Sequence, residues 1–429
     1  MRIIKNAPQL FSFFICLLLL ILRFNQKFCV QSFWAEDGMQ FFSRALNYGI
    51  SYKSTIAPYA GYFHFFPRII SLIALLIPLK FVPIFFNLSC ILFTSFVFSL
   101  FGSNHYKHII SSNYLRLLVC TLFVFSPGLT DILGNLANIH SIFLFLVPLL
   151  YLKNINYKYC LFDYFLISLS TLTEGAVIIF LPLFFFKIIQ KRKQSVNAFF
   201  EKYALSLIII VAISCILLNS QNSTSESTHN YLNSIDIYFK TFVNFGLLKP
   251  FVTESFLDHH KLEGKIVYLI TFIALSLMIR TFFRTKTTFI TKQFLLYLLT
   301  VPLLFSLITL VRSDIIFFNK KLDYESWWKF RYSFMAVTAY IIPMIYFISL
   351  LPNKYIQFIM ISFTVIISLS SIPNRFFIPS YDEKYDWNKH YKKVELFIKE
   401  KDNKTLKKER SVPIPPGHPW SVWIAPNND

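Results

Sequence analysis

Two adjacent carboxylates, Glu36 and Asp37, begin the first long polar stretch of this chain, which runs from residue 33 to residue 68. Gly38 and an amphipathic run follow them. Carboxylates at the start of a helix complement its dipole, which explains one acid more easily than two in tandem. The second explanation is chemical: one carboxylate is the general base that deprotonates an acceptor hydroxyl, and its neighbour orients the acceptor or a cation. The residues alone leave both explanations open.

The same stretch ends in a polar and aromatic cluster at the entry to the next apolar segment. Tyr59 and His64 lie in this cluster, either as ordinary residues of the membrane–water interface or as contacts for a substrate. Arg68 lies three residues inside the apolar run. It either extends its charge to the membrane surface or pairs with an anion, such as a lipid-linked phosphate.

Polar residues also occur where later apolar segments begin or meet. Asn135 and Asn138 are three residues apart, so a helix would place them on one face, for hydrogen bonds between helices or to sugar hydroxyls. Glu174 joins two short apolar segments, either in a simple exposed turn or in a functional site. Arg331 ends a loop just before an apolar segment, where its guanidinium either anchors the loop at the interface or binds a phosphate.

The composition predicts that membrane-spanning helices position these residues. Of the 429 residues, 55% are hydrophobic and only 15% are charged, whereas about 25% are charged in a soluble domain. Many apolar runs reach or approach the roughly 20 residues that cross a bilayer. We therefore predict an all-α fold, a polytopic transmembrane helix bundle. The net charge of +20 does not indicate a nucleic-acid partner, because the Lys and Arg residues lie between the apolar runs, as the positive-inside rule predicts. The six cysteines lack C-x-x-C spacing, so neither a disulfide framework nor a metal site is predicted.

The apolar runs and the charges of the loops predict about 11 to 13 spans. Basic loops are placed in the cytoplasm, and the loops that hold Glu36, Asp37, Asn135, Glu174 and Arg331 are placed outside. The candidate spans are Gln9–Leu22, Phe65–Gly102, Tyr114–Leu129, Ala137–Leu152, Tyr159–Leu172, Ala176–Ile189, Tyr203–Leu218, Ile266–Phe283, Phe289–Val311, Tyr332–Leu351 and Tyr355–Ile372. Segment 65–102 reads as two pieces but must cross an odd number of times, so one half is re-entrant or one loop is misassigned.

These boundaries divide the chain into a transmembrane domain, 1–372, and a small tail on the outer side, 373–429. The first outer loop, 26–64, is expected to carry a short interfacial helix between Asp37 and Tyr48 that ends at Gly49. Aromatic residues and prolines in the tail predict a segment folded back against the membrane interface.

An apolar first span followed by an outer loop with paired acids resembles the GT-C superfamily of membrane glycosyltransferases. The strings WAEDG at 34–38 and PYAGY at 58–62, followed by Pro67 and Arg68, look like bacterial glucosyltransferases that decorate O-antigen or other surface polysaccharides. Segments 134–140, 172–183, 331–332 and 413–420 are similar in order and placement.

The resemblance implies a polyprenyl-phosphate sugar donor, a polysaccharide or glycolipid acceptor, and transfer of a hexose, with glucose favoured. Asp37 or Glu36 would be the catalytic base, and Arg331 or Arg68 would hold the donor phosphate. Tyr59, His64, Asn135, Asn138 and Glu174 would contact substrate. No cofactor or metal is expected.

The same resemblance implies a multi-pass protein of the bacterial inner membrane, with its site facing the periplasm. Two rival functions stay open. One is a polysaccharide flippase or transporter, which would place acids near the middle of the bilayer. The other is an O-antigen polymerase, which is also polytopic and carries an outer loop.

Overall fold

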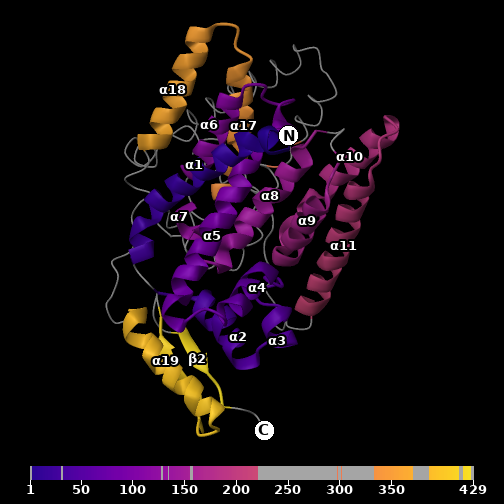
Figure 1. The fold of residues 1–429 in the computed structure, drawn as a ribbon. Helices are drawn as coiled ribbons and strands as arrows, with labels where there is room; N and C mark the ends of the chain where they lie inside the picture. The colour runs from indigo at the N-terminus through magenta and orange to yellow at the C-terminus, as the bar shows by residue number, and fades with distance from the viewer. Residues whose placement is uncertain are drawn as a thin grey trace, which may run out of the picture.

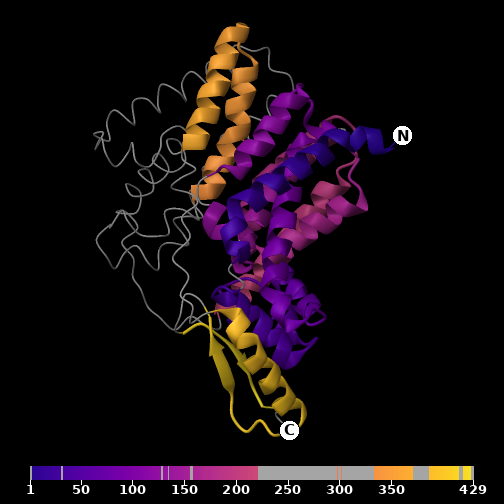
Figure 2. The same ribbon diagram turned by 60° about the vertical axis from the view of Figure 1, so that its left-hand side comes forward.

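The protein is described from a computed structural model, which defines residues 2–29, 32–126, 129–133, 135–154, 158–220, 297, 301, 333–370, 386–414 and 419–426. The described chain is mostly helical, as predicted, with a single two-stranded sheet among its described residues. Figure 1 shows α8 (His140–Leu152) in the middle of the helices, with α18 (Lys354–Ser370) and α11 (Phe199–Ser220) toward the edges, and Figure 2 shows the same bundle from another side. All side chains of α8 are buried. This helix is the centre of the hydrophobic core, and its two ends define two polar regions.

Of the other long helices, α9 (Leu161–Thr173), α5 (Val82–Ser99) and α17 (Ser333–Ser349) pack on α8, and most of the long helices overlap the ranges of predicted spans. The remaining long helices are α1 (Arg2–Cys29), α4 (Phe65–Ala74), α6 (Asn113–Val124), α10 (Leu181–Lys193), α11 and α18. Short helical pieces connect them: η2 (Leu79–Phe81), η3 (Leu100–Gly102), η4 (Asn104–Tyr106), α7 (Leu129–Ile132), η5 (Ala137–Ile139) and η6 (Gly175–Phe180). The predicted span at 266–283 lies outside the described residues, as does the span at 289–311 apart from residues 297 and 301.

Two of the described helical segments, Leu79–Gly102 and Phe199–Leu218, are long and apolar enough to cross a membrane. Several other apolar helices are shorter, with 10 to 17 residues in their apolar parts. Segment 65–102 forms two pieces, as expected. The first piece, α4, has ten residues and a length of about 15 Å, half of a hydrocarbon core of about 30 Å.

The first loop folds into a continuous helical run from Asp37 to Tyr48. Its first part, η1 (Asp37–Phe42), is a π-helix, and its second part, α2 (Ser43–Tyr48), is an α-helix that ends at Gly49, where φ is +52°. The helix and its end were predicted correctly. Its apolar side chains Phe41, Phe42 and Ala45 are buried inside the protein. A short helix α3 (Tyr52–Thr55) and a tight turn at Ala60 and Gly61, both with positive φ, complete the loop.

The described part of the tail forms helix α19 (Trp387–Asp402) and a hairpin of strands β1 (Arg410–Pro413) and β2 (Ser421–Ile424). Figure 2 shows this unit at the lower end of the bundle, beside the first-loop helices. The indole of Trp387 is fully buried and donates to Leu79 O at 2.7 Å. The tail therefore folds back on the first loop and on η2 of the same chain.

Strand β2 pairs with α2 through side-chain hydrogen bonds. The backbone N–H of Trp423 donates to Ser43 Oγ at 2.9 Å, and that of Ala425 donates to Asn47 Oδ1 at 2.8 Å. The indole of Trp423 donates to Met39 O at 2.9 Å, within the π-helix. The tail thus covers the side of the first-loop helix that holds Ser43 and Asn47.

Candidate functional site

Asp37 connects the first-loop helix to the N-terminal end of α8. Its side chain is 2% exposed, and its two carboxylate oxygens accept the backbone N–H groups of Leu136 and Ala137, both at 2.8 Å. These N–H groups begin η5, the turn that leads into α8. A carboxylate at this position satisfies helix N–H groups that have no partner within the helix. The contact fixes the start of α8 against the first loop.

His140, the first residue of α8, is paired with Glu174. The distance between Nδ1 of His140 and Oε2 of Glu174 is 2.6 Å, and the Glu174 side chain is fully buried. The second oxygen, Oε1, accepts the backbone N–H of Ala176 at 2.8 Å. A carboxylate on Nδ1 fixes the orientation of the imidazole and stabilises its protonated form. The pair can therefore hold a proton inside the protein. The alternative of a simple exposed turn at Glu174 is wrong.

His64 lies between this pair and the aromatic residues of the first loop. Its backbone is in the left-handed region (φ +50°), just before α4, and its side chain is buried. The His64 ring lies 5.4 Å from the rings of Phe41 and Tyr62, 5.7 Å from that of Tyr59 and 6.0 Å from that of His140. A left-handed conformation is costly for a residue other than glycine, and such outliers concentrate at functional sites.

Glu36 is half-buried, next to Asp37 but with different surroundings. Its charge lies close enough to Tyr59 to affect that hydroxyl. Burial first, and the Glu36 carboxylate second, raise the pKa of Tyr59 to about 12, while Arg44 acts in the opposite direction. Tyr59 is therefore a neutral hydrogen-bond donor at physiological pH. Glu36, Tyr59 and Arg44 form a second polar group on the first loop.

Arg68 is directed at backbone carbonyls. Its Nε donates to Phe63 O at 2.7 Å, its Nη1 donates to Lys53 O at 3.2 Å and Ser54 O at 3.4 Å, and its Nη2 donates to Ala57 O. The side chain is 1% exposed. These bonds hold the loop between α3 and α4, which is a structural role. None of these contacts supports the prediction that Arg68 holds a phosphate.

The structure brings the other predicted residues to the same end of α8, with one exception. Asn135 and Asn138 are both buried, and Asn138 N–H donates to Asn135 O at 3.1 Å. Oδ1 of Asn135 is buried without a hydrogen-bond partner. Arg331 lies outside the described residues. Within the described residues, the acids Asp37 and Glu174 and the two asparagines thus lie at the same end of α8.

Sequence reasoning did not select His140, Tyr62 or Arg44. The sequence did contain a signal for His140, because this histidine follows Asn135 and Asn138 at the start of a predicted span. The pairing of His140 with Glu174 crosses 34 positions of the chain, so spacing could not reveal it.

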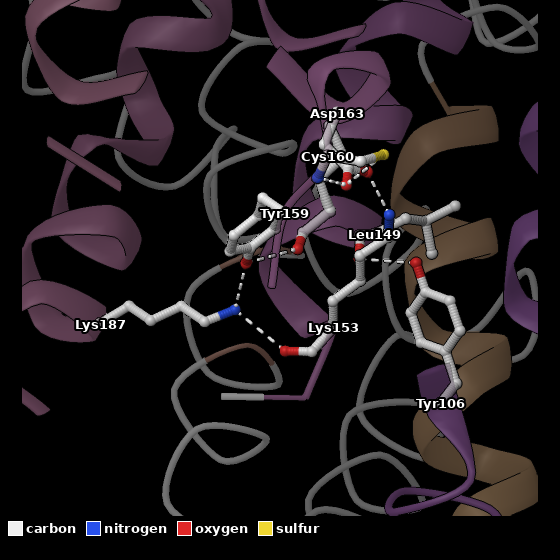
Figure 3. A network of polar contacts seen from close by, with 8 residues as sticks. Tyr106, Leu149, Lys153, Tyr159, Cys160, Asp163 and Lys187 are labelled. Carbon is white, nitrogen blue, oxygen red and sulfur yellow. Dashed lines mark hydrogen bonds and ion pairs between the residues drawn. The ribbon is translucent and has the colours of Figure 1, made fainter. Parts of the chain in front are cut away.

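The opposite end of α8 carries a second polar cluster, shown in Figure 3. The ammonium group of Lys187 donates to Tyr151 O, to Lys153 O at 3.0 Å and to Tyr159 Oη at 2.8 Å. Lys153 is in turn paired with Asp163. Cations and hydroxyls thus satisfy the carbonyls at the buried C-terminal end of α8.

The basic loops predicted to share one side meet at this second cluster. Tyr106 Oη donates to Leu149 O at 2.9 Å, and Lys191 pairs with Glu201 at 2.8 Å. These contacts join segments 103–113, 153–158 and 187–202, whereas the acids at 36, 37 and 174 gather at the other end. The described parts of the chain therefore separate basic loops from acidic ones across the length of α8.

No family model, curated protein or solved structure matches this chain. Among the described residues, no group of three or more His, Cys, Asp or Glu side chains could hold a metal ion.

Proposed function

We propose that this chain is a multi-pass membrane glycosyltransferase that moves a hexose from a polyprenyl-phosphate donor to a hydroxyl of a polysaccharide or glycolipid acceptor. One observation carries the proposal. Carboxylates, imidazoles and tyrosines from the first loop, α8 and the α9–η6 junction converge at one end of a central buried helix. Separate segments that supply proton-accepting and hydroxyl-binding groups to one place are what group transfer between sugars needs.

The position of the buried acids favours an enzyme over a transporter. Asp37, Asp163, Glu174 and Glu201 each lie within a turn of a helix end. A transporter would be expected to place such groups near the middle of the bilayer, whereas these acids gather at the two ends of α8. In the proposed orientation, the end of α8 that holds Asp37 faces the outside of a bacterial inner membrane, because the basic cluster occupies the other end. The short α4 is then the re-entrant half of segment 65–102, and α5 makes the single crossing.

Within this function, Glu36 is the general base and Asp37 is a positioning residue. Both oxygens of Asp37 are hydrogen-bonded to backbone N–H groups, which weakens a carboxylate as a proton acceptor. Glu36 is half-buried, and its charge acts on the neutral hydroxyl of Tyr59. Glu36 accepts the proton of the acceptor hydroxyl, whose oxygen attacks the anomeric carbon. The bond from that carbon to the phosphate oxygen breaks, and polyprenyl phosphate leaves with the bonding electrons.

The test is a transfer assay in membranes with polyprenyl-phosphate glucose and candidate acceptors. Glu36→Gln keeps size and hydrogen bonding but removes the base, so we expect transfer to fall by about 100-fold or more while the thermal unfolding midpoint is unchanged. Asp37→Asn loses an acceptor for one N–H group, so we expect both stability and transfer to fall. Full transfer by Glu36→Gln with loss in a stable Asp37→Asn would reverse the two roles. No transfer by the wild type to any acceptor would count against the enzyme.

A further inference from the structure

The first-loop helix presents a row of three polar residues that make no hydrogen bond to the tail within the described structure. Glu36, Gln40 and Arg44 are spaced by four residues along the helical run that ends at Tyr48, so they share one face. The other polar residues of the helix, Ser43 and Asn47, bond to β2. The row therefore lies apart from the face that the tail covers.

Arg44 is half-buried, and within the described structure it makes neither a hydrogen bond nor an ion pair. Its charge acts on Tyr59 and is repelled by the guanidinium of Arg68. Arg68 is occupied by backbone carbonyls, and the exposed ammonium of Lys53 lies 4.7 Å from the centre of the Tyr48 ring. Arg44 is thus the guanidinium of the loop that remains available for an anion.

Gln40 supplies the second observation. Its Oε1 is buried and accepts no hydrogen bond in the described structure. A buried carbonyl oxygen without a donor costs about 1–3 kcal/mol, so such groups call for an explanation. A ligand hydroxyl would satisfy this oxygen, and an anion would satisfy the guanidinium one helical turn away. One molecule that offers both groups is a sugar phosphate.

We infer that Arg44 and Gln40 form the donor site, in which Arg44 binds the phosphate of a polyprenyl-phosphate sugar and Gln40 accepts a hydrogen bond from a sugar hydroxyl. This assignment rests on the proposed transferase function. A guanidinium suits the task because its planar donors can bind two phosphate oxygens together. Glu36 lies one turn before Gln40 on the same face, so the base and the donor would meet at the sugar.

The experiment measures binding by the full-length protein in detergent, without any transfer step. The ligands are farnesyl phosphate, farnesyl-phosphate glucose, farnesol and inorganic phosphate. Wild type should bind the first two, with farnesol and inorganic phosphate at least tenfold weaker, since each lacks one half of the ligand. Arg44→Gln should weaken binding of both phosphorylated lipids by about tenfold or more. The matched control Lys53→Gln removes an exposed cation from the same loop and should stay within about twofold of wild type.

Gln40→Leu separates the sugar from the phosphate. It should weaken farnesyl-phosphate glucose and leave farnesyl phosphate unchanged. Arg44→Lys keeps the charge without the planar donors and should give an intermediate loss, which serves if Arg44→Gln does not fold. Wild-type affinity in both Arg44 variants, or equal losses in Arg44→Gln and Lys53→Gln, would overturn the assignment and leave the transferase proposal standing. Failure of the wild type to bind either phosphorylated lipid would overturn both.

Discussion

The tail packs directly against Gly38 of the first-loop helix, and we predict that Gly38→Ala loosens the tail. A Cβ at Gly38 would lie 2.5 Å from Ile414 Cδ1, 3.0 Å from Val422 Cγ2 and 3.2 Å from Phe33 Cβ. The first distance cannot persist, so Ile414 must turn its flexible side chain away, and Val422 and Phe33 must each move by a few tenths of an ångström. Overpacking of this kind costs about 1–3 kcal/mol. Replacing glycine by alanine in a helix returns at most about 1 kcal/mol.

The net cost of up to about 2 kcal/mol should raise the fraction of molecules with an undocked hairpin by up to roughly 30-fold. Hydrogen exchange measures this fraction directly, because the amides of Trp423 and Ala425 bond to side chains of α2 only in the docked state. We expect these two amides to exchange faster by that factor, while the amides inside α8 exchange as in the wild type. Transfer should fall as well, because Glu36 lies two residues before the substituted position.

A second substitution provides the control. Ile414→Val removes the Cδ1 atom that the new Cβ would strike, and alone it should cost about 0.5–1.5 kcal/mol. In the double variant the two losses should not add, since the smaller side chain admits the extra methyl group. Rescue should be partial because Val422 and Phe33 remain close. Unchanged exchange in Gly38→Ala, or strictly additive losses in the double variant, would refute the packing argument.

Three further predictions concern the loop and the buried pair. Arg68→Lys should destabilise the protein nearly as much as Arg68→Met, and each should cost about 3 kcal/mol. The reason is that an ammonium group cannot reach all four carbonyls that the guanidinium binds. Thermal unfolding of both variants checks this. Glu174→Ala leaves His140 without its carboxylate and should cost about 3–5 kcal/mol, whereas the double change with His140→Phe should cost less than the sum in the same measurement. The folded-state pKa of Tyr59, about 12, lies above the unfolded value near 10. The contribution of neutral Tyr59 to the free energy of unfolding is therefore complete below about pH 10 and disappears as the pH rises to about 12. Tyr59→Phe should remove this part of the loss of stability at alkaline pH, which a series of unfolding measurements at increasing pH checks.

Local patterns in the sequence predicted the parts of the site that depend on neighbouring residues. The spacing of Phe41, Phe42 and Ala45 gave the first-loop helix, and Gly49 gave its end. The charges of the loops separated the two ends of α8, because positively charged segments avoid one side of a membrane whatever the detailed fold.

Local sequence patterns could not predict contacts between segments that are far apart in the chain. The sequence predicted that Arg68 could bind a phosphate, because the sequence does not show that backbone carbonyls of residues 53–63 accept hydrogen bonds from its guanidinium. The tail was expected at the membrane interface, since aromatic residues suit either a lipid headgroup layer or a protein surface. Only the complementary hydrogen bonds of Trp423 with Met39 and Ser43 distinguish the two.

The two adjacent acids are explained by the geometry of the helix that they begin. Successive residues of a helical turn point in directions roughly 100° apart, so neighbours cannot serve the same contact. Asp37 points inward to the N–H groups of Leu136 and Ala137, and this contact sets the direction in which Glu36 projects. The tail holds the same π-helix from its other side, through Met39 O. The π-helix is therefore held on one side by the start of α8 and on the other side by the hairpin. For this reason, the position of Glu36 relative to Arg44 depends on both of these contacts.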